Sequence, residues 1–181
     1  MHLEGTVTIN APRARVYDFL TDPHQVTQCA PGVERVEVVV PGQSFRATAS
    51  VGFGTVKARF TGDVEWLELD APDRAKMKAH GNASGSAADV VSEMFLADAA
   101  NGATELRWTA DVNVVGQIAS LAARLMGTIS QKLTGLFFDC VRKKIEAGPQ
   151  PEPGQPSAPE PMAAPSPEPP QPKAPDQAAG P

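Results

Sequence analysis

The hydrophobic pattern of the chain changes once, near residue 116, from strand-like alternation to helical spacing. Between Gly116 and Ile145, apolar side chains recur every three or four residues, which places them along one side of a helix. They are Ile118, Leu121, Ala122, Leu125, Met126, Ile129, Leu133, Leu136, Phe137, Cys140, Val141 and Ile145. At about 1.5 Å per residue this helix would be roughly 45 Å long. Because it follows all the predicted strands, we expect it to lie across a sheet.

Seven segments before this helix are predicted strands, most of them with clear period-two alternation. They are Leu3–Asn10, Val33–Val40, Ser44–Val51, Thr55–Leu69, Arg74–Ala83, Ser86–Ala97 and Thr104–Val114. Two short helices are expected after the first strand, one starting near Pro12 and one over about His24–Cys29. Short connections and polar outward faces indicate an antiparallel sheet. The predicted fold class is α+β: a curved antiparallel sheet of about seven strands around a long C-terminal helix.

The inward face of the predicted sheet combines large side chains with many small ones. The large residues are Phe45, Phe60, Trp66, Met77 and Trp108, and the small ones are Ala47, Ala49, Ala58, Gly62, Ala75, Ala79, Gly81 and Ala110. So many small inward residues leave two possibilities: either the long helix approaches the sheet very closely, or an apolar cavity remains between them. The spacing alone does not choose between a cavity and a packed core.

Composition divides the chain into two parts. Residues 148–181 contain thirteen of the eighteen prolines and no aromatic or β-branched residue. Such a segment buries too little apolar area to offset its ordering entropy, so we predict a disordered Pro/Ala-rich tail. Residues 1–147 have the length of one domain with its own core.

Charge and cysteine content exclude some classes of protein. The tail carries −3 of the net charge of −5, and no basic stripe supports nucleic-acid binding. Only Cys29 and Cys140 occur, without a secretory signal pattern, so we predict reduced thiols in the cytoplasm. No run of 18 apolar residues predicts a membrane span, so any membrane contact is expected to be peripheral.

Signals for catalysis or metal binding are weak. His2, His24 and His80 have no carboxylate or nucleophile nearby in sequence, and we interpret them as surface residues. Cys29 would need a base to act as a nucleophile, and only His24 is close, so a structural thiol is favoured. Metal-ligand spacings such as CxxC or HExxH do not occur.

Several segments, taken in order, resemble one known family. They are LEGTVTINAPRARVYDFLTDP, QCAPGVERVE, GFGTVKARFTGDV, AHGNASGSA and TELRWTADVNVVGQIASLAARL, followed by a helix ending in FFDCVRKKI. Over about residues 2–145 the chain resembles the CoxG family of carbon monoxide dehydrogenase subunits, within the START/SRPBCC helix-grip superfamily. The resemblance implies a deep apolar cavity under the long helix, with no intrinsic cofactor.

The family resemblance also implies a function in recruitment rather than chemistry. We expect a non-enzymatic carrier of an apolar ligand, such as menaquinone or another respiratory quinone, or a lipid. It would bring a CO-dehydrogenase-type molybdenum hydroxylase to the inner face of the cytoplasmic membrane and link it to the quinone pool. The tail departs from an anchor, because it is mildly acidic and has only Met162 as a sizeable apolar group. A spacer, a partner-binding segment or a solubilising tail remain open for it.

From this resemblance we expect a set of cavity and entrance residues. The wall would contain Phe60, Val64, Trp66, Met77, Trp108, Val112, Leu125, Met126, Ile129 and Leu133, and the entrance Cys29, Pro31 and Phe53. Two alternatives remain: an assembly or docking factor for the dehydrogenase without a ligand, and an enzyme that uses the pocket as some SRPBCC cyclases do. The enzyme is the weaker alternative, because inward titratable groups are nearly absent from the pattern.

Overall fold

The structure, a computed structural model, describes residues 1–53 and 55–147, except for the side chains of residues 53, 56, 125, 126, 128 and 129. Its strands are β1 (His2–Ile9), β2 (Val33–Val40), β3 (Ser44–Phe53), β4 (Val56–Asp70), β5 (Arg74–Ala83), β6 (Ser86–Asp98) and β7 (Thr104–Gly116). Its helices are α1 (Arg13–Thr21), α2 (Pro23–Val26) and α3 (Ala119–Glu146), with a short 3₁₀ turn at Ala100–Gly102.

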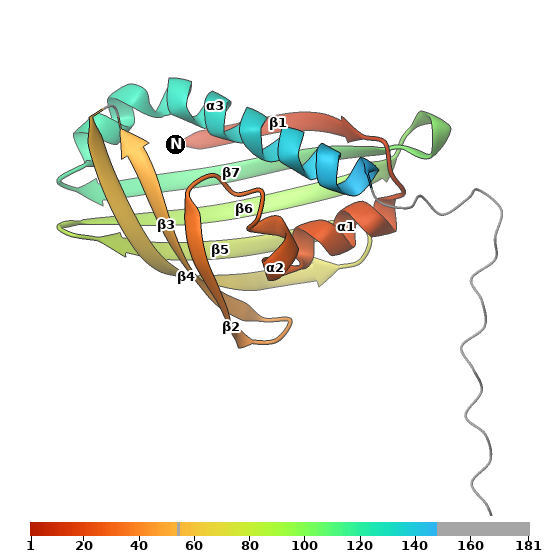
Figure 1. Cartoon of the computed structure of the whole chain (residues 1–181), viewed down its shortest axis with the longest axis horizontal. Coiled ribbons are helices and arrows are strands. Elements are labelled where there is room, and N and C mark those ends of the chain that lie inside the picture. The colour runs from red at the N-terminus through yellow and green to blue at the C-terminus, as the bar shows by residue number, and fades with distance from the viewer. Residues whose placement is uncertain (54, 148–181) are drawn as a thin grey trace, which may run out of the picture. The chain divides into compact units, whose positions relative to one another are not determined.

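The seven strands form one antiparallel sheet in the order β1-β7-β6-β5-β4-β3-β2. Figure 1 shows the sheet curving around α3, with α1 and α2 near the C-terminal end of that helix. Only β1 is out of sequence order, because it pairs with β7 after the chain has passed through the other strands. The predicted α+β architecture is therefore confirmed.

The boundary between the last strand and α3 differs from the expectation. β7 continues to Gly116, and α3 begins three residues later, at Ala119. Gly116 has φ +90°, and a Cβ there would lie 2.2 Å from the carbonyl oxygen of Gly85. Only glycine satisfies both conditions, so Gly116 ends the strand and turns the chain rather than starting the helix.

Two clusters of apolar residues pack α3 against the sheet, one near each end of the helix. Near its C-terminus, Val141 and Ile145 are fully buried with Ile9 in the larger cluster. Near its N-terminus, Ala122 packs with Ala58 in a smaller cluster. The middle of the helix lies between these contacts, over the centre of the sheet.

The buried hydroxyl of Thr104 connects β7 to the segment that leads into α1. It donates a hydrogen bond of 2.7 Å to the carbonyl oxygen of Ala11, and Thr104 is completely buried. We predict that Thr104→Val lowers the free energy of unfolding by about 1–3 kcal/mol, because the buried carbonyl loses its partner. Urea unfolding measures this change.

Thr61→Val is the matched control, because Thr61 is exposed and its hydroxyl contacts only the exposed Thr48 hydroxyl, at 3.3 Å. We expect its effect to stay within about 0.5 kcal/mol. Equal stability of the two variants would contradict the assigned role of Thr104.

Candidate ligand-binding cavity

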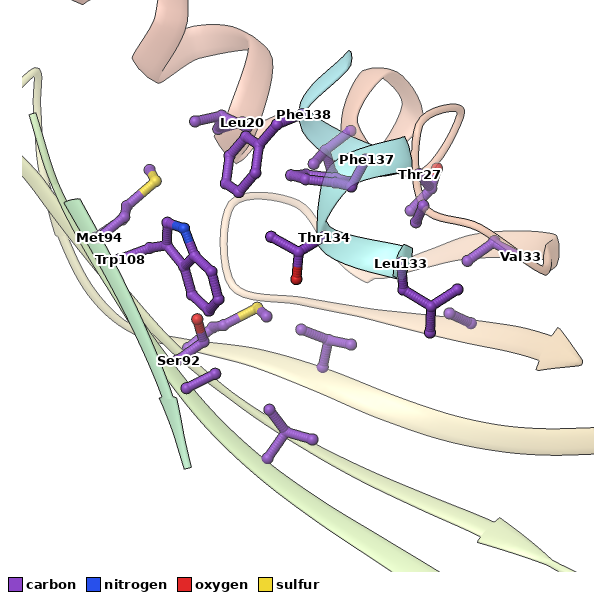
Figure 2. A pocket seen from close by; sticks show the side chains of 18 of the residues that line it. Leu20, Thr27, Val33, Ser92, Met94, Trp108, Leu133, Thr134, Phe137 and Phe138 are labelled. Atoms are coloured by element: carbon purple, nitrogen blue, oxygen red, sulfur yellow. The ribbon is translucent and has the colours of Figure 1, made fainter. Parts of the chain in front are cut away.

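A cavity of about 480 Å³ lies between the middle of α3 and the sheet. α3 contributes Leu133, Thr134, Phe137 and Phe138, which Figure 2 shows above the strands. The sheet contributes Leu3, Val33, Phe45, Ala47, Val64, Trp66, Ala75, Met77, Val90, Ser92, Met94, Leu106, Trp108 and Ala110, and the remaining wall residues are Leu20, Val26, Thr27, Ala30 and Pro31. Of the two possibilities that the sequence leaves open, the structure therefore contains the cavity.

The described wall is uncharged and mostly apolar, with three hydroxyl-bearing residues: Thr27, Ser92 and Thr134. Aromatic rings form one end of it. The Trp108 and Phe138 rings lie 6.0 Å apart, and Phe138 meets Phe137 edge-on at 5.0 Å. Gly5 leaves room for this arrangement, because a Cβ there would lie 2.8 Å from the indole nitrogen of Trp108.

Five of the residues expected at the wall line this cavity: Val64, Trp66, Met77, Trp108 and Leu133. Three of them come from β4 and β5, one from β7 and one from α3. Alternation along the strands places their side chains on the concave face, where they meet the helix.

Other expected wall residues lie elsewhere or outside the described side chains. Phe60 packs in the small cluster near the start of α3, beyond the end of the cavity. Val112 is not among the residues that line the cavity, although its cross-strand partner Val90 is. The side chains of Leu125, Met126 and Ile129 are not described, so their place at the wall stays a prediction.

The sequence pattern missed several wall residues. Ser92 and Met94 were overlooked because the phase of β6 is ambiguous from its sequence. The register resolves it: Met94 lies opposite Trp108 and Ser92 opposite Ala110, both of which face the cavity. Phe138 lies beside the predicted apolar stripe, and the aromatic contact with Trp108 is what draws it into the wall.

The prediction of two reduced thiols is wrong in this structure. Cys29 and Cys140 form a disulfide across 111 residues of sequence, with their Cα atoms 5.4 Å apart. Cys29 follows α2 and Cys140 lies on α3, one turn after Phe137, so helix packing rather than sequence spacing brings them together. The Lys144 ammonium adds a second link by donating to the side-chain oxygen of Gln28, at 2.6 Å.

This disulfide fixes one expected entrance segment against the helix. Ala30 and Pro31, which line the cavity, directly follow Cys29. Of the other expected entrance residues, the Phe53 side chain lies outside the described residues. The entrance assignment of Cys29, Pro31 and Phe53 stays a prediction.

We predict that the Cys29→Ala/Cys140→Ala variant has a free energy of unfolding about 4 kcal/mol below that of the oxidised protein, because a loop of this length gains much entropy when opened. Urea unfolding of both proteins measures the difference. Thiol alkylation followed by intact-mass measurement is the control. Quantitative labelling of both cysteines in the native protein, without reductant, would contradict the disulfide.

A second pocket adjoins the cavity and shares Phe45 and Trp66 with it. Tyr17 lines this pocket from α1, and its buried hydroxyl has no hydrogen-bond partner among the described residues. Burial, and then the negative charges of Asp70 and Asp18, raise the pKa of Tyr17. The hydroxyl therefore stays protonated at neutral pH.

The histidines do not form a catalytic site with this cavity. Strand pairing brings the imidazole of His80 to 2.5 Å from Asp89, and that of His2 to 2.8 Å from Asp111, pairings that sequence distance had concealed. The hydrogen bond and charge of Asp89 raise the pKa of His80. Both pairs are exposed, and none of their residues lines the cavity.

Two searches of the described residues bear on metals and membranes. Residues 1–53 and 55–147 hold no group of three or more His, Cys, Asp or Glu side chains arranged to bind a metal ion. Within the same ranges, no helix has both the length and the apolar character needed to cross a bilayer.

A curved antiparallel sheet that encloses a long C-terminal helix and an apolar cavity defines the helix-grip class, and solved structures agree. A conserved protein from Geobacillus kaustophilus shares 20% identity at a TM-score of 0.75, covering 81% of this chain and 96% of its own. The Zhui aromatase/cyclase from Streptomyces sp. R1128 shares 18% at 0.63, covering 81% and 93%. Ara h 8.0201 shares 15% at 0.60, covering 82% and 99%.

Sequence comparison identifies the family within this class. Residues 5–146 match the family model that describes the carbon monoxide dehydrogenase protein CoxG. The chain belongs to the CoxG family, as its resemblance predicted. A search of curated proteins finds no significant match.

Proposed function

We propose that this protein is a non-enzymatic carrier that binds a neutral apolar ligand, a respiratory quinone such as menaquinone, and recruits a CO-dehydrogenase-type molybdenum hydroxylase to the cytoplasmic membrane. The observation that carries the proposal is the cavity of about 480 Å³ under α3, with its uncharged described wall. CoxG membership and the helix-grip fold suggest a ligand-binding carrier role linked to CO dehydrogenase. In this proposal residues 1–147 form the carrier domain and residues 148–181 a spacer.

The chemistry of the wall supports a neutral ligand. A cavity of this size lies in the range that holds small molecules, and its apolar walls gain free energy by excluding water. A carboxylate or phosphate would be buried there without a described cation to compensate its charge. Aromatic side chains such as Trp66 and Trp108 offer flat surfaces against which a quinone ring can stack.

Two other functions explain fewer of these observations. A docking or assembly factor without a ligand has no need of the cavity, which would then be only a loss of packing. An enzyme is favoured by the likeness to an aromatase/cyclase, which shows the fold alone. Acid–base catalysis requires a titratable group at the reacting atoms, and the described wall residues supply none of the usual ones.

We predict that the purified protein yields a quinone or another neutral lipid on solvent extraction and mass spectrometry. The double variant Ala47→Leu/Ala110→Leu should lose this ligand, because both alanines face the cavity from the sheet and larger side chains fill it. Ala97→Leu is the matched control, since Ala97 is exposed on β6 and does not line the cavity.

The dehydrogenase separates the carrier from a ligand-free docking factor. Under the carrier proposal, the filled variant still binds the dehydrogenase but no longer supports electron transfer to membrane quinone. If recruitment and electron transfer both survive filling, the carrier proposal is wrong. Wild-type protein that contains no lipid and does not bind added quinone would also overturn it.

Peripheral membrane association is the other part of the proposal, and an exposed apolar edge supports it. Val40 at the end of β2 and Leu69 at the end of β4 line the second pocket, are more than one-third exposed and leave much of their apolar surface in water. Val39 and Leu67 beside them are also exposed. Clustered apolar side chains of this kind are typical of membrane or partner contacts.

We predict that Val40→Ser/Leu69→Ser weakens binding to phosphatidylcholine vesicles at least tenfold, because burying each methylene in lipid contributes about 0.8 kcal/mol. Vesicle co-sedimentation measures binding. Val91→Ser is the control, because Val91 is similarly exposed but lies within β6, away from the second pocket. If the control reduces binding as strongly as the double variant, the β2/β4 edge is not the contact surface.

A further inference from the structure

We propose that the hydroxyl of Thr134 donates a hydrogen bond to a carbonyl oxygen of the ligand, and so makes the cavity selective for quinones and related ketones over hydrocarbons of the same shape. This inference rests on the proposed carrier function, and it names the side chain that recognises the ligand's head group. Thr134 stands on the middle of α3, between the two packed ends of the helix.

The Thr134 hydroxyl faces the cavity rather than its own helix. Figure 2 shows its oxygen directed away from α3, toward the space beside Trp108 and Ser92. A threonine within a helix commonly donates back to the carbonyl three or four residues earlier. Ser130 on the same helix does so, to the Gly127 carbonyl at 3.2 Å, whereas the Thr134 hydroxyl has no partner among the described residues.

The other two hydroxyls of the wall already donate to the protein. Thr27 donates to the carbonyl of Pro23 at 2.5 Å, and Ser92 donates to the carbonyl of Thr109 at 2.9 Å. Among the described hydroxyls of the cavity, the Thr134 hydrogen is therefore the one still available to a ligand. An available donor in an apolar wall is complementary to a neutral acceptor.

This donor separates ligand classes by simple energetics. A hydrocarbon in the cavity would leave the hydroxyl without a partner after displacing water, which carries a penalty. A carbonyl oxygen would satisfy it. An anionic acceptor would also satisfy it, but would bury its charge against an uncharged wall. The matching ligand is therefore neutral and carries a carbonyl group on an apolar frame, which is the chemistry of a quinone.

The test compares two probes of similar shape: menadione, which has two carbonyl groups, and 2-methylnaphthalene, which has none. Calorimetric titration gives the affinity of each for the full-length wild-type protein, Thr134→Val, Thr134→Ser and Thr48→Val. We expect Thr134→Val to weaken menadione binding roughly three- to tenfold and to leave 2-methylnaphthalene binding unchanged, because valine keeps the shape and removes the donor. Thr134→Ser keeps the donor and should retain most of the preference for menadione.

Thr48→Val is the matched control, because it makes the same substitution at an exposed hydroxyl outside the cavity. Unchanged binding of 2-methylnaphthalene shows that Thr134→Val is folded with its cavity intact. If wild-type protein binds both probes and Thr134→Val weakens neither or both equally, the assignment of Thr134 is wrong and the carrier function stands. If wild-type protein binds neither probe nor menaquinone, the carrier function itself is wrong.

Discussion

The structure depends on the packing of α3 against the sheet at both ends of the helix. Val141 and Ile145 bury one end completely, and Ala122 packs closely against Ala58 at the other. With both ends fixed, the middle of the helix is held over a concave sheet whose inward alanines are too small to fill the space. The cavity therefore follows from two short regions of close packing, and it does not require its own walls to be tightly packed.

The uncharged wall and its single available donor determine what this cavity suits. Burial of apolar surface favours any hydrophobic molecule of suitable size, and the absence of charge from the described wall disfavours anions. Thr134 then adds a directional preference that burial alone does not supply. The disulfide between Cys29 and Cys140 holds the wall segment that follows Cys29 against α3, so this side of the chamber is preorganised.

Periodicity made the architecture predictable, because every strand and the long helix bury one face. It also predicted wall residues such as Trp66 and Trp108, whose direction follows from strand alternation. It failed where position along an element matters: Phe60 faces inward but lies beyond the cavity, in the cluster near the start of α3. The Cys29–Cys140 disulfide depends on contacts across 111 residues, and no local pattern carries that information.

The central claim is that the space under α3 is a chamber for a neutral ligand, and methyl NMR of the methionines tests it most directly. Met77 and Met94 line the cavity, whereas Met1 is exposed at the N-terminus. Titration with menadione should shift the methyl resonances of Met77 and Met94 saturably and leave that of Met1 in place. If menadione shifts neither cavity methionine, or shifts only Met1, the chamber does not bind the ligand and the account is contradicted.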